Sequence, residues 1–438
     1  MKAYPEYKAS GIDWLGDIPS HWKTIKSSYI FDNIGSGTTP TAGEDLYYEY
    51  GSINWLQTGD LNDGVINSTS KKITPFAVES RNLRFYDKGS VVIAMYGATI
   101  AKLGLLDIRT TVNQACCVLT PSTFINSKYA FYFFYSAKNE LISLASGGGQ
   151  PNISQATISN FKLPVPTISE QEVIAAYLDD VTGKVDALIA EKQKQVEDIR
   201  AYRTSLITET VTRGLNPDTP LRPSGIDWLG DIPQHWEIIK SSYVFDNIGS
   251  GTTPTSGEEL YYEGGSVNWL QTGDLNDGVI NSTSKKITPF AVESKNLKFY
   301  NKGSVVIAMY GATIAKLGLL NIQTTVNQAC CVLTPSTNIY SKYAFYCFYS
   351  AKNELISLAS GGGQPNISQA TISDFKLPVP PLAEQQSIAD FLDAKTAKID
   401  ELISELTKQI DELTEYKQAV ITEAVTGKVD VRDYKPSN

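Results

Sequence analysis

The chain is one unit written twice, and this internal repeat constrains its fold more than any other feature. The decapeptide SGIDWLGDIP at residues 10–19 returns unchanged at residues 224–233, an offset of 214 (224 − 10). With that offset, 17 of the 157 positions in 10–166 differ from their counterparts in 224–380, so about 89% are identical. Of the 46 positions that follow in each unit, 26 differ. Each unit therefore joins a nearly invariant first part to a divergent second part.

The first part of each unit is predicted to be a globular, β-rich domain. Two short β-prone runs, Ser90–Met95 and Gln114–Leu119, lie between turn-forming segments such as Asn62–Gly64. Tyr129–Leu144 has the apolar spacing of a helix, and the glycines at 147–149 are expected to end it. Strands and helices within one domain predict the α+β class, twice over.

The second part of each unit is predicted to be one long helix that pairs as a coiled coil. Residues 168–212 contain no proline and a single glycine, Gly183, and Ser169 with Glu172 fits a capping box at the start. Apolar residues recur about every 3.5 residues, the coiled-coil period, and about 45 residues at ~1.5 Å each would span roughly 68 Å. The predicted seam residues are Val185, Leu188, Lys192, Val196, Ile199, Tyr202 and Leu206 in the first helix, and Ile399, Leu402, Leu406, Ile410, Leu413, Tyr416 and Val420 in the second.

Linker length predicts the topology. The second globular domain must begin near the far end of the first helix, and the second helix buries its seam by packing antiparallel on the first. We therefore expect two globular domains at opposite ends of a long antiparallel two-helix coiled coil, related by a pseudo-twofold axis, with the two chain ends meeting. The expected limits are 1–166 and 224–380 for the globular domains, 167–212 and 381–426 for the helical spacers, 213–223 for the linker and 427–438 for the tail.

Charge and composition narrow the partners and the compartment. The chain carries a net charge of −9, but residues 10–166 hold 12 basic and 12 acidic side chains and residues 224–380 hold 10 and 12, so a net charge of −7 lies on the helices and tails. A strong non-specific grip on DNA is therefore not expected, and the acidic helices suit a protein partner. There is no apolar stretch long enough for a membrane span, no secretory signal, and no cysteine spacing for disulfides or zinc, so we expect a cytoplasmic protein.

Motifs for catalysis are absent from the sequence. The glycine-rich run at 147–152 lacks the lysine of a phosphate-binding loop, and there is no N-P-P-F motif for amino-group methylation. His21 and His235 are two copies of one histidine, with no ligand at metal-binding spacing. Cys116 and Cys117 lie in an apolar run and are expected to be buried and inert. These absences favour a binding protein with no metal and no cofactor of its own.

Several motifs resemble those of the specificity subunits of type I restriction–modification systems. The strongest are LPVPPLAEQQSIADFLD at Leu377–Asp393 and LPVPTISEQEVIAAYLD at Leu163–Asp179, where the first copy has threonine for the second proline. GIDWLGDIPxHW at the start of each unit, GSGTTPT at Gly35–Thr41 and WLQTGD at Trp55–Asp60 also fit. The resemblance extends over essentially the whole chain and includes the two-repeat layout.

The resemblance implies a non-catalytic subunit. Its two target-recognition domains would each bind half of a bipartite site in double-stranded DNA, and its helices would act as a ruler. The helices would dock two methyltransferase subunits, which use S-adenosylmethionine to methylate adenine. Restriction subunits, which use ATP and Mg²⁺, would translocate and cut unmodified DNA. Because the two domains are nearly identical, we expect two near-identical half-sites, arranged as an inverted repeat around a non-specific spacer.

Candidate DNA-binding residues lie in loops of the globular domains. Glutamine and asparagine can bind adenine, aspartate can accept from cytosine, and lysine suits phosphate, although each residue could instead stabilise a turn. Arg81 and Arg84, which become lysine in the second copy, are expected to contact phosphate or solvent rather than bases. The candidates are Thr38, Thr39, Thr41, Gln57, Thr58, Asp60, Lys71, Lys72, Asn113 and Gln114, with Thr252, Thr253, Thr255, Gln271, Thr272, Asp274, Lys285, Lys286, Asn327 and Gln328 in the second domain.

Two other functions remain open at this point. A symmetric scaffold that binds proteins, with no role on DNA, would have the same repeat and the same lack of catalytic motifs. A hydrolase that uses the Thr, Asp and Lys loops has less support. A sequence-specific shift of DNA in the presence of a methyltransferase partner distinguishes the first interpretation from both.

Overall fold

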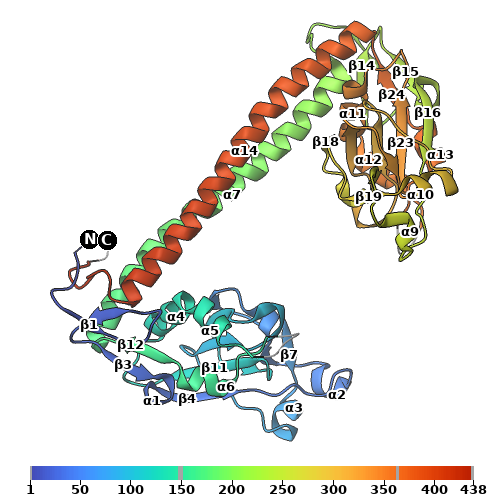
Figure 1. The fold of residues 1–438 in the computed structure, drawn as a ribbon. Coiled ribbons are helices and arrows are strands. Elements are labelled where there is room, and N and C mark those ends of the chain that lie inside the picture. The colour runs from blue at the N-terminus through green and yellow to red at the C-terminus, as the bar shows by residue number, and fades with distance from the viewer. Residues whose placement is uncertain (1, 147–150, 362–364, 436–438) are drawn as a thin grey trace. The chain divides into compact units, whose positions relative to one another are not determined.

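The computed structural model describes residues 2–146, 151–361 and 365–435. The chain divides into two compact units, Met1–Gln193 together with Lys408–Asn438, and Lys194–Thr407. Each unit contains one β-rich domain and a part of both long helices (Figure 1). The expected α+β class is confirmed.

A five-stranded sheet forms the centre of the first domain. Its strands lie in the order β4-β11-β8-β9-β6, and only β6 and β9 pair in parallel. Every residue of β8 and β9 is buried, because α4 packs on one face of these strands and a second apolar cluster around Leu56 and Tyr86 covers the other. The bounds are β4 Phe31–Ser36, β6 Gly64–Ile66, β8 Val91–Ala94, β9 Leu103–Leu106, β11 Cys116–Pro121 and α4 Ser127–Ser136. The two β-prone runs of the sequence are thus confirmed as β8 and β11.

A smaller three-stranded sheet, β10-β5-β7, has its own core around Trp55. In Figure 1 it lies, with α2 and α3, at the end of the domain away from β12 and β3. These elements are β5 Ile53–Leu56, β7 Lys71–Ile73, β10 Thr111–Val112, α2 Asp45–Tyr48 and α3 Pro75–Ser80. The remaining elements are β1 Tyr7–Ala9 with β2 Asp17–Pro19, β3 Lys23–Lys26 with β12 Lys162–Val165, α1 Ser27–Ile30, α5 Lys138–Ser143, α6 Gln155–Asn160, η1 Thr58–Asp60 and η2 Gly97–Thr99.

The helix predicted over Tyr129–Leu144 is two helices in the structure. α4 ends at Ser136, and α5 begins at Lys138 after Ala137, whose φ and ψ are −88° and 8°. The turn at buried Ala137 changes the direction of the chain, so that Leu141 of α5 also reaches the core. A uniform apolar spacing across both helices hid this break. The predicted stop at 147–149 lies outside the described residues.

The second unit repeats these elements in the same sheet orders. Its strands are β13 Leu221–Pro223, β14 Asp231–Pro233, β15 Glu237–Lys240, β16 Phe245–Ser250, β17 Val267–Leu270, β18 Gly278–Ile280, β19 Lys285–Ile287, β20 Val305–Ala308, β21 Leu317–Leu320, β22 Thr325–Val326, β23 Cys330–Pro335 and β24 Lys376–Val379. Its short helices are α8 Ser241–Val244, α9 Glu259–Tyr262, η3 Thr272–Asp274, α10 Pro289–Ser294, η4 Gly311–Thr313, α11 Ser341–Ser350, α12 Lys352–Ser357 and α13 Gln369–Asp374.

Two long helices follow the domains: α7 spans Ile168–Arg213 and α14 spans Leu382–Val425. In the first unit they run antiparallel, since Lys192 contacts Gln409 while Asp186 contacts Lys417. The start of α7 differs from the predicted capping box. The helix begins at Ile168, and the hydroxyl of Thr167 accepts a hydrogen bond from the Glu170 N–H at 3.4 Å. Ser169 therefore lies inside the helix, and the predicted cap is wrong by two residues.

At four positions, the residue that lies in the seam between the helices is the one directly after the residue predicted from the sequence. Leu188, Tyr202, Leu402 and Tyr416 are exposed, and the half-buried seam residues are instead Ile189, Arg203, Ile403 and Lys417. The buried or half-buried positions then alternate in steps of three and four, the regular heptad pattern. Two of these positions are cationic, and cations were not expected there. The predicted seam residues Val185, Val196, Leu406 and Val420 are buried.

The two chain ends lie together in the first unit. Lys2 and Asp430 form a β-bridge, and Tyr4 packs in the same core as Val431. Arg432 lies over the Tyr4 ring, 5.0 Å from its centroid, and pairs with Asp430 at 2.6 Å. This side-chain hydrogen bond lowers the pKa of Asp430.

No helix within the described ranges combines the length and the hydropathy needed to cross a bilayer.

Candidate nucleic-acid interface

Three loops of the first domain, distant in sequence, meet beside the end of β5. The strands β5 and β10 are parallel neighbours, so the segments that follow them emerge at the same edge. The Asn113 N–H donates to the Leu56 carbonyl at 3.0 Å, and the Gly37 N–H donates to the Asn113 carbonyl at 3.3 Å. The candidate residues in 38–41, 57–60 and 113–114 therefore form one cluster, which we call the three-loop cluster.

The backbone of Gly37 lies directly against the backbone carbonyl of Val112. A Cβ atom at this position would lie 1.6 Å from the Val112 carbonyl oxygen, so no other residue fits without movement of the backbone. Gly37, the second glycine of GSGTTPT, thus brings the threonine loop against β10, the strand that Asn113 directly follows. Trp55 also contacts this loop, because its indole N–H donates a hydrogen bond to the Thr38 carbonyl at 3.3 Å.

The exposed side chains of the cluster are polar or cationic. Thr38, Thr39 and Gln114 are exposed, and the Thr39 hydroxyl donates to the Gln114 side-chain oxygen. Lys71 and Lys72 lie exposed on β7, which pairs with β5 next to the cluster. Hydroxyl, amide and ammonium groups on one surface are the groups that bind phosphates and base edges.

Two candidates are occupied by structural hydrogen bonds. Both carboxylate oxygens of Asp60 accept backbone N–H groups, from Gln57 at 2.8 Å and from Ser70 at 3.0 Å. The Asn113 side-chain oxygen accepts from the Ala115 N–H at 3.2 Å. These bonds favour turn stabilisation over base recognition for Asp60 and Asn113. Gln57 and Thr58 remain candidates for base contact, and so does exposed Gln114 through its amide NH2 group, since its oxygen accepts from Thr39.

The second domain builds the same cluster from the same residues. Asn327 N–H donates to the Leu270 carbonyl at 2.9 Å, and Trp269 donates to the Thr252 carbonyl at 3.3 Å. Asp274 again accepts two backbone N–H groups, both at 2.9 Å, and Asn327 accepts from Ala329 at 3.1 Å. Thr253, Thr255, Lys285, Lys286 and Gln328 are exposed, and Gln271 and Thr272 are half-buried. Each domain therefore presents the same polar side chains on this surface, although among the described residues the Gly37–Asn113 and Thr39–Gln114 hydrogen bonds occur in the first domain and not in the second.

The copies differ at one cation beside the cluster. Arg81 donates to the Thr41 hydroxyl at 2.8 Å and lies over the Tyr47 ring, 5.1 Å from its centroid. Lys295 lies over the equivalent ring of Tyr261 at 5.0 Å. Both cations rest on a tyrosine, which fits their predicted role outside base recognition.

Sequence reasoning missed the role of the Glu–Gln pair in the signature motif. The Gln171 side chain accepts from the Asn126 N–H at 2.8 Å and donates to the Phe124 and Pro166 carbonyls, both at 3.1 Å. Glu170 accepts from His21 at 3.0 Å and from the Trp22 indole at 3.1 Å. The first turn of α7 is thereby joined to its domain. The recurrence of Glu and Gln in two divergent helices was the available signal.

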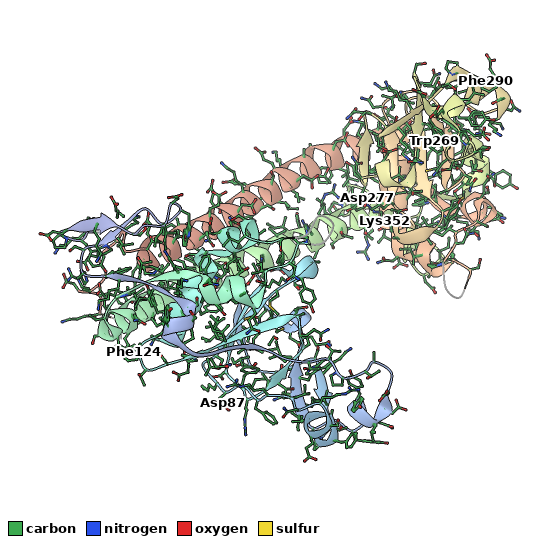
Figure 2. All side chains as sticks on the ribbon, turned by 60° about the horizontal axis from the view of Figure 1, so that its bottom comes forward. Asp87, Phe124, Trp269, Asp277, Phe290 and Lys352 are labelled. Atoms are coloured by element: carbon green, nitrogen blue, oxygen red, sulfur yellow. The ribbon has the colours of Figure 1, made fainter. Side chains whose placement is uncertain are left out.

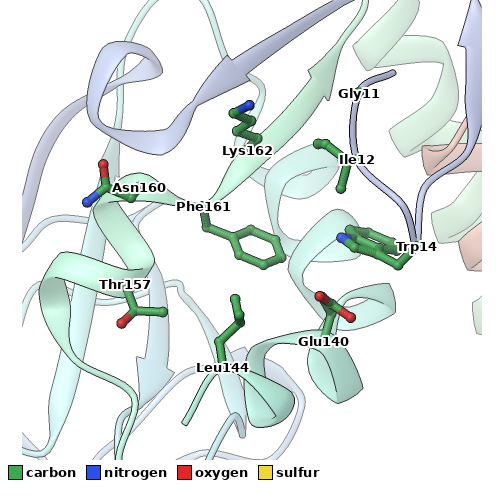
Figure 3. A pocket seen from close by; sticks show the side chains of 9 residues that line it. All are labelled: Gly11, Ile12, Trp14, Glu140, Leu144, Thr157, Asn160, Phe161 and Lys162. Carbon is green, nitrogen blue, oxygen red and sulfur yellow. The ribbon is translucent and has the colours of Figure 1, made fainter. Parts of the chain in front are cut away.

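The first domain also contains a pocket and two buried cysteines. A pocket of about 420 Å³, shown in Figure 3, lies where Trp14 stacks on Phe161, and it contains no residue of the three-loop cluster. Cys116 and Cys117 are buried, and burial raises the pKa of the Cys117 thiol to about 12, which disfavours a reactive thiolate. Within the described part of the chain there is no group of three metal-ligating side chains.

Comparison with known proteins adds independent information. A family model described as the type I restriction modification DNA specificity domain matches the chain twice, at 19–198 and 233–412. The specificity subunit of type I restriction enzyme MjaIX from Methanocaldococcus jannaschii is 24% identical over 428 residues, which is 96% of each chain. That of EcoR124I/EcoR124II from Escherichia coli is 24% identical over 308 residues, covering 66% of this chain and 67% of that protein.

A solved structure also shares the fold. It comes from work on complex assembly and conformational transition of the type I R-M system, and it matches with a TM-score of 0.72 and 17% identity. The match covers 94% of this chain and 99% of the other.

Proposed function

The chain belongs to the type I restriction–modification DNA specificity family, and from this premise we propose that it recognises two copies of one half-site. A specificity subunit recognises DNA sequence and leaves catalysis to other subunits. The observation that carries the finer proposal is the equivalence of the two three-loop clusters, with the same residue types and matching hydrogen bonds. Two equivalent clusters select equivalent bases.

The half-sites form an inverted repeat around a non-specific spacer. The pseudo-twofold axis expected from the sequence repeat would match the local twofold axis of a DNA duplex, as in dimeric DNA-binding proteins. Gln57, Thr58 and Gln114, with Gln271, Thr272 and Gln328, contact base edges, and Lys71, Lys72, Lys285 and Lys286 contact phosphates. The loop threonines lie close to the sugar–phosphate backbone of the DNA. They are Thr38, Thr39 and Thr41 in the first domain and Thr252, Thr253 and Thr255 in the second.

The partners follow from the same premise. Two methyltransferase subunits dock on the helices and use S-adenosylmethionine to methylate adenine within each half-site. Restriction subunits, which use ATP and Mg²⁺, join this complex. The acidic surface of the helices supports a protein partner there rather than a phosphate backbone.

The proposal is tested by mapping methylated adenines in a host that expresses the chain with its methyltransferase partner. We expect one bipartite motif whose two halves are inverted copies. Two unrelated half-sites would overturn the equivalence of the domains. If no sequence-specific methylation or DNA shift occurred with the partner present, a protein-binding scaffold would be the better account.

The helices set the spacer between the half-sites. Inserting seven residues at matched positions, between Lys184 and Leu206 and between Lys398 and Val420, keeps the heptad register and lengthens the pair by about 10.5 Å, or roughly three base pairs. We expect the spacer to grow accordingly while the half-site bases stay the same. A change in the bases would refute the division between recognition domains and ruler.

A further inference from the structure

Tyr349 of the second unit lies between the helices and the recognition domain, within reach of two cations. Arg203 of α7 lies 5.1 Å from the ring centroid, and Lys352, at the start of α12, lies 4.6 Å from it. Each cation is also paired with an aspartate. Arg203 donates to Asp400 of α14 at 2.9 and 3.2 Å, and Lys352 contacts Asp277 at 2.5 Å. Figure 2 shows Asp277 and Lys352 beside each other in this unit.

The first unit has the same arrangement around Tyr135. Lys417 of α14 lies 5.9 Å from the ring centroid and Lys138 of α5 lies 4.3 Å from it. Lys417 contacts Asp186 at 2.7 Å, and Lys138 contacts Asp63 at 2.6 Å. We call each set the cation–tyrosine clamp. Of its helical members, the aspartate is identical in the two copies (Asp186 and Asp400) and the cation keeps its charge (Arg203 and Lys417), although 26 of the 46 helix positions differ.

The clamp cations are unusually well shielded for lysine and arginine. The exposed fractions of the side chains are 16% for Arg203, 19% for Lys417, 22% for Lys352 and 23% for Lys138. A cation over an aromatic ring is held more strongly when it is shielded from water. Arg203 and Lys417 also occupy positions of the helix seam, so they cannot move without disturbing the pairing of the helices.

Each unit also contains a hydrogen bond between the domain and the long helix that follows it in the chain. The Tyr132 hydroxyl donates to Asp179 of α7 at 2.8 Å, and the Tyr346 hydroxyl donates to Asp393 of α14 at 2.7 Å. Each domain is thus attached to the helix that follows it. The other helix of the pair also packs on the domain, since Val425 of α14 lies in the first domain's core and Val211 of α7 in the second. The clamp adds a polar contact further along that helix, at Lys417 and at Arg203. Contacts at two separated points along a helix restrict rotation of the domain more than contact at one point.

We propose that Tyr135 and Tyr349 are positioning residues that hold each recognition domain at a set angle on the helix pair and so restrict the spacer length. This rests on the proposed recognition of a bipartite site. One base pair moves a half-site by about 3.4 Å and turns it by roughly 35°. Angular play of that size at the joint would admit neighbouring spacer lengths.

The test uses the full chain with its methyltransferase partner and the variant Tyr135→Leu/Tyr349→Leu, which removes both rings. Methylated adenines are mapped, and sites with spacers one base pair longer or shorter are compared with the correct spacer. We expect unchanged half-site bases and a roughly tenfold rise in relative methylation of the off-length sites. A variant with a lower melting temperature but unchanged spacer selectivity would overturn the proposal.

Two controls separate the clamp from a purely packing role. Tyr135→Phe/Tyr349→Phe keeps both rings and should keep spacer selectivity. Arg203→Lys introduces the residue found at the equivalent Lys417, and it should also be neutral. Should the leucine variant fail to fold, Arg203→Gln/Lys417→Gln removes the helix cation from each ring and carries the same expectation and the same refuting result. Failure of the clamp proposal can be distinguished from failure of the proposed function. In the second case, the wild-type protein itself would show no bipartite methylation motif.

Discussion

The Trp22 indole N–H donates to Glu170 at 3.1 Å, whereas the corresponding N–H of Trp236 is buried without a hydrogen-bond partner among the described residues. Tyr4, from the N-terminal segment, also donates to Glu170 at 2.8 Å, and the equivalent position in the second unit is Asp218. The hydrogen bonds that join each domain to its helix therefore differ between the two units, although the domains are nearly identical in sequence.

Glu170→Ala should destabilise the protein by about 1–3 kcal/mol, because it leaves the buried Trp22 N–H and the Tyr4 hydroxyl without an acceptor. Glu384→Ala is the matched control and should cost less, since the Trp236 N–H already has no partner. Urea unfolding of both variants measures the difference. Equal losses would contradict this account of the two joints.

Gly37→Ala should weaken specific DNA binding roughly tenfold, equivalent to ~1.4 kcal/mol, in a gel-shift assay with the methyltransferase partner. The new methyl group would meet the Val112 carbonyl and break the Gly37–Asn113 contact that assembles the three-loop cluster. Ala42→Ser, in the same loop, introduces the residue of the second copy and should bind normally. Normal binding by Gly37→Ala would show that the cluster does not depend on this approach.

Gly183→Ala should raise stability by about 1 kcal/mol, because glycine is a poor helix former and alanine a good one. Gly183 lies inside α7, has no positive φ, and has open space around the position of an added Cβ. Thermal unfolding followed by circular dichroism measures the shift. A lower melting temperature would mean that the helix needs flexibility at this point.

Lys192→Leu should stabilise the helix pair and promote association between chains. Lys192 is half-buried in the seam and donates to the Gln409 amide oxygen at 2.5 Å, while the equivalent position of α14 holds buried Leu406. A polar residue at such a position reduces stability but selects the pairing partner. Light scattering and thermal unfolding test both effects. A more stable variant that stays as monomeric as the wild type would remove any role for Lys192 in partner choice.

Much of the architecture follows from residue order alone. A repeat with an offset of 214 residues implies two like domains, and unbroken heptad-like segments imply two long helices, because both patterns are local properties of the chain. The strands β8 and β11 were likewise predictable from their apolar runs. The candidate loop residues were named from side-chain chemistry, and those of the first domain lie in or beside one cluster.

Folding in three dimensions settled what local patterns left ambiguous. Apolar side chains at both 188 and 189 fit a helical seam, and only packing against the second helix selects Ile189 and leaves Leu188 exposed. Asp60 has the chemistry to bind cytosine, yet its oxygens are taken by backbone groups that arrive from Gln57 and Ser70. Partners brought from elsewhere in the chain assign each polar group its role, and hydrogen bonds across long sequence separations leave no periodic trace in the amino-acid order.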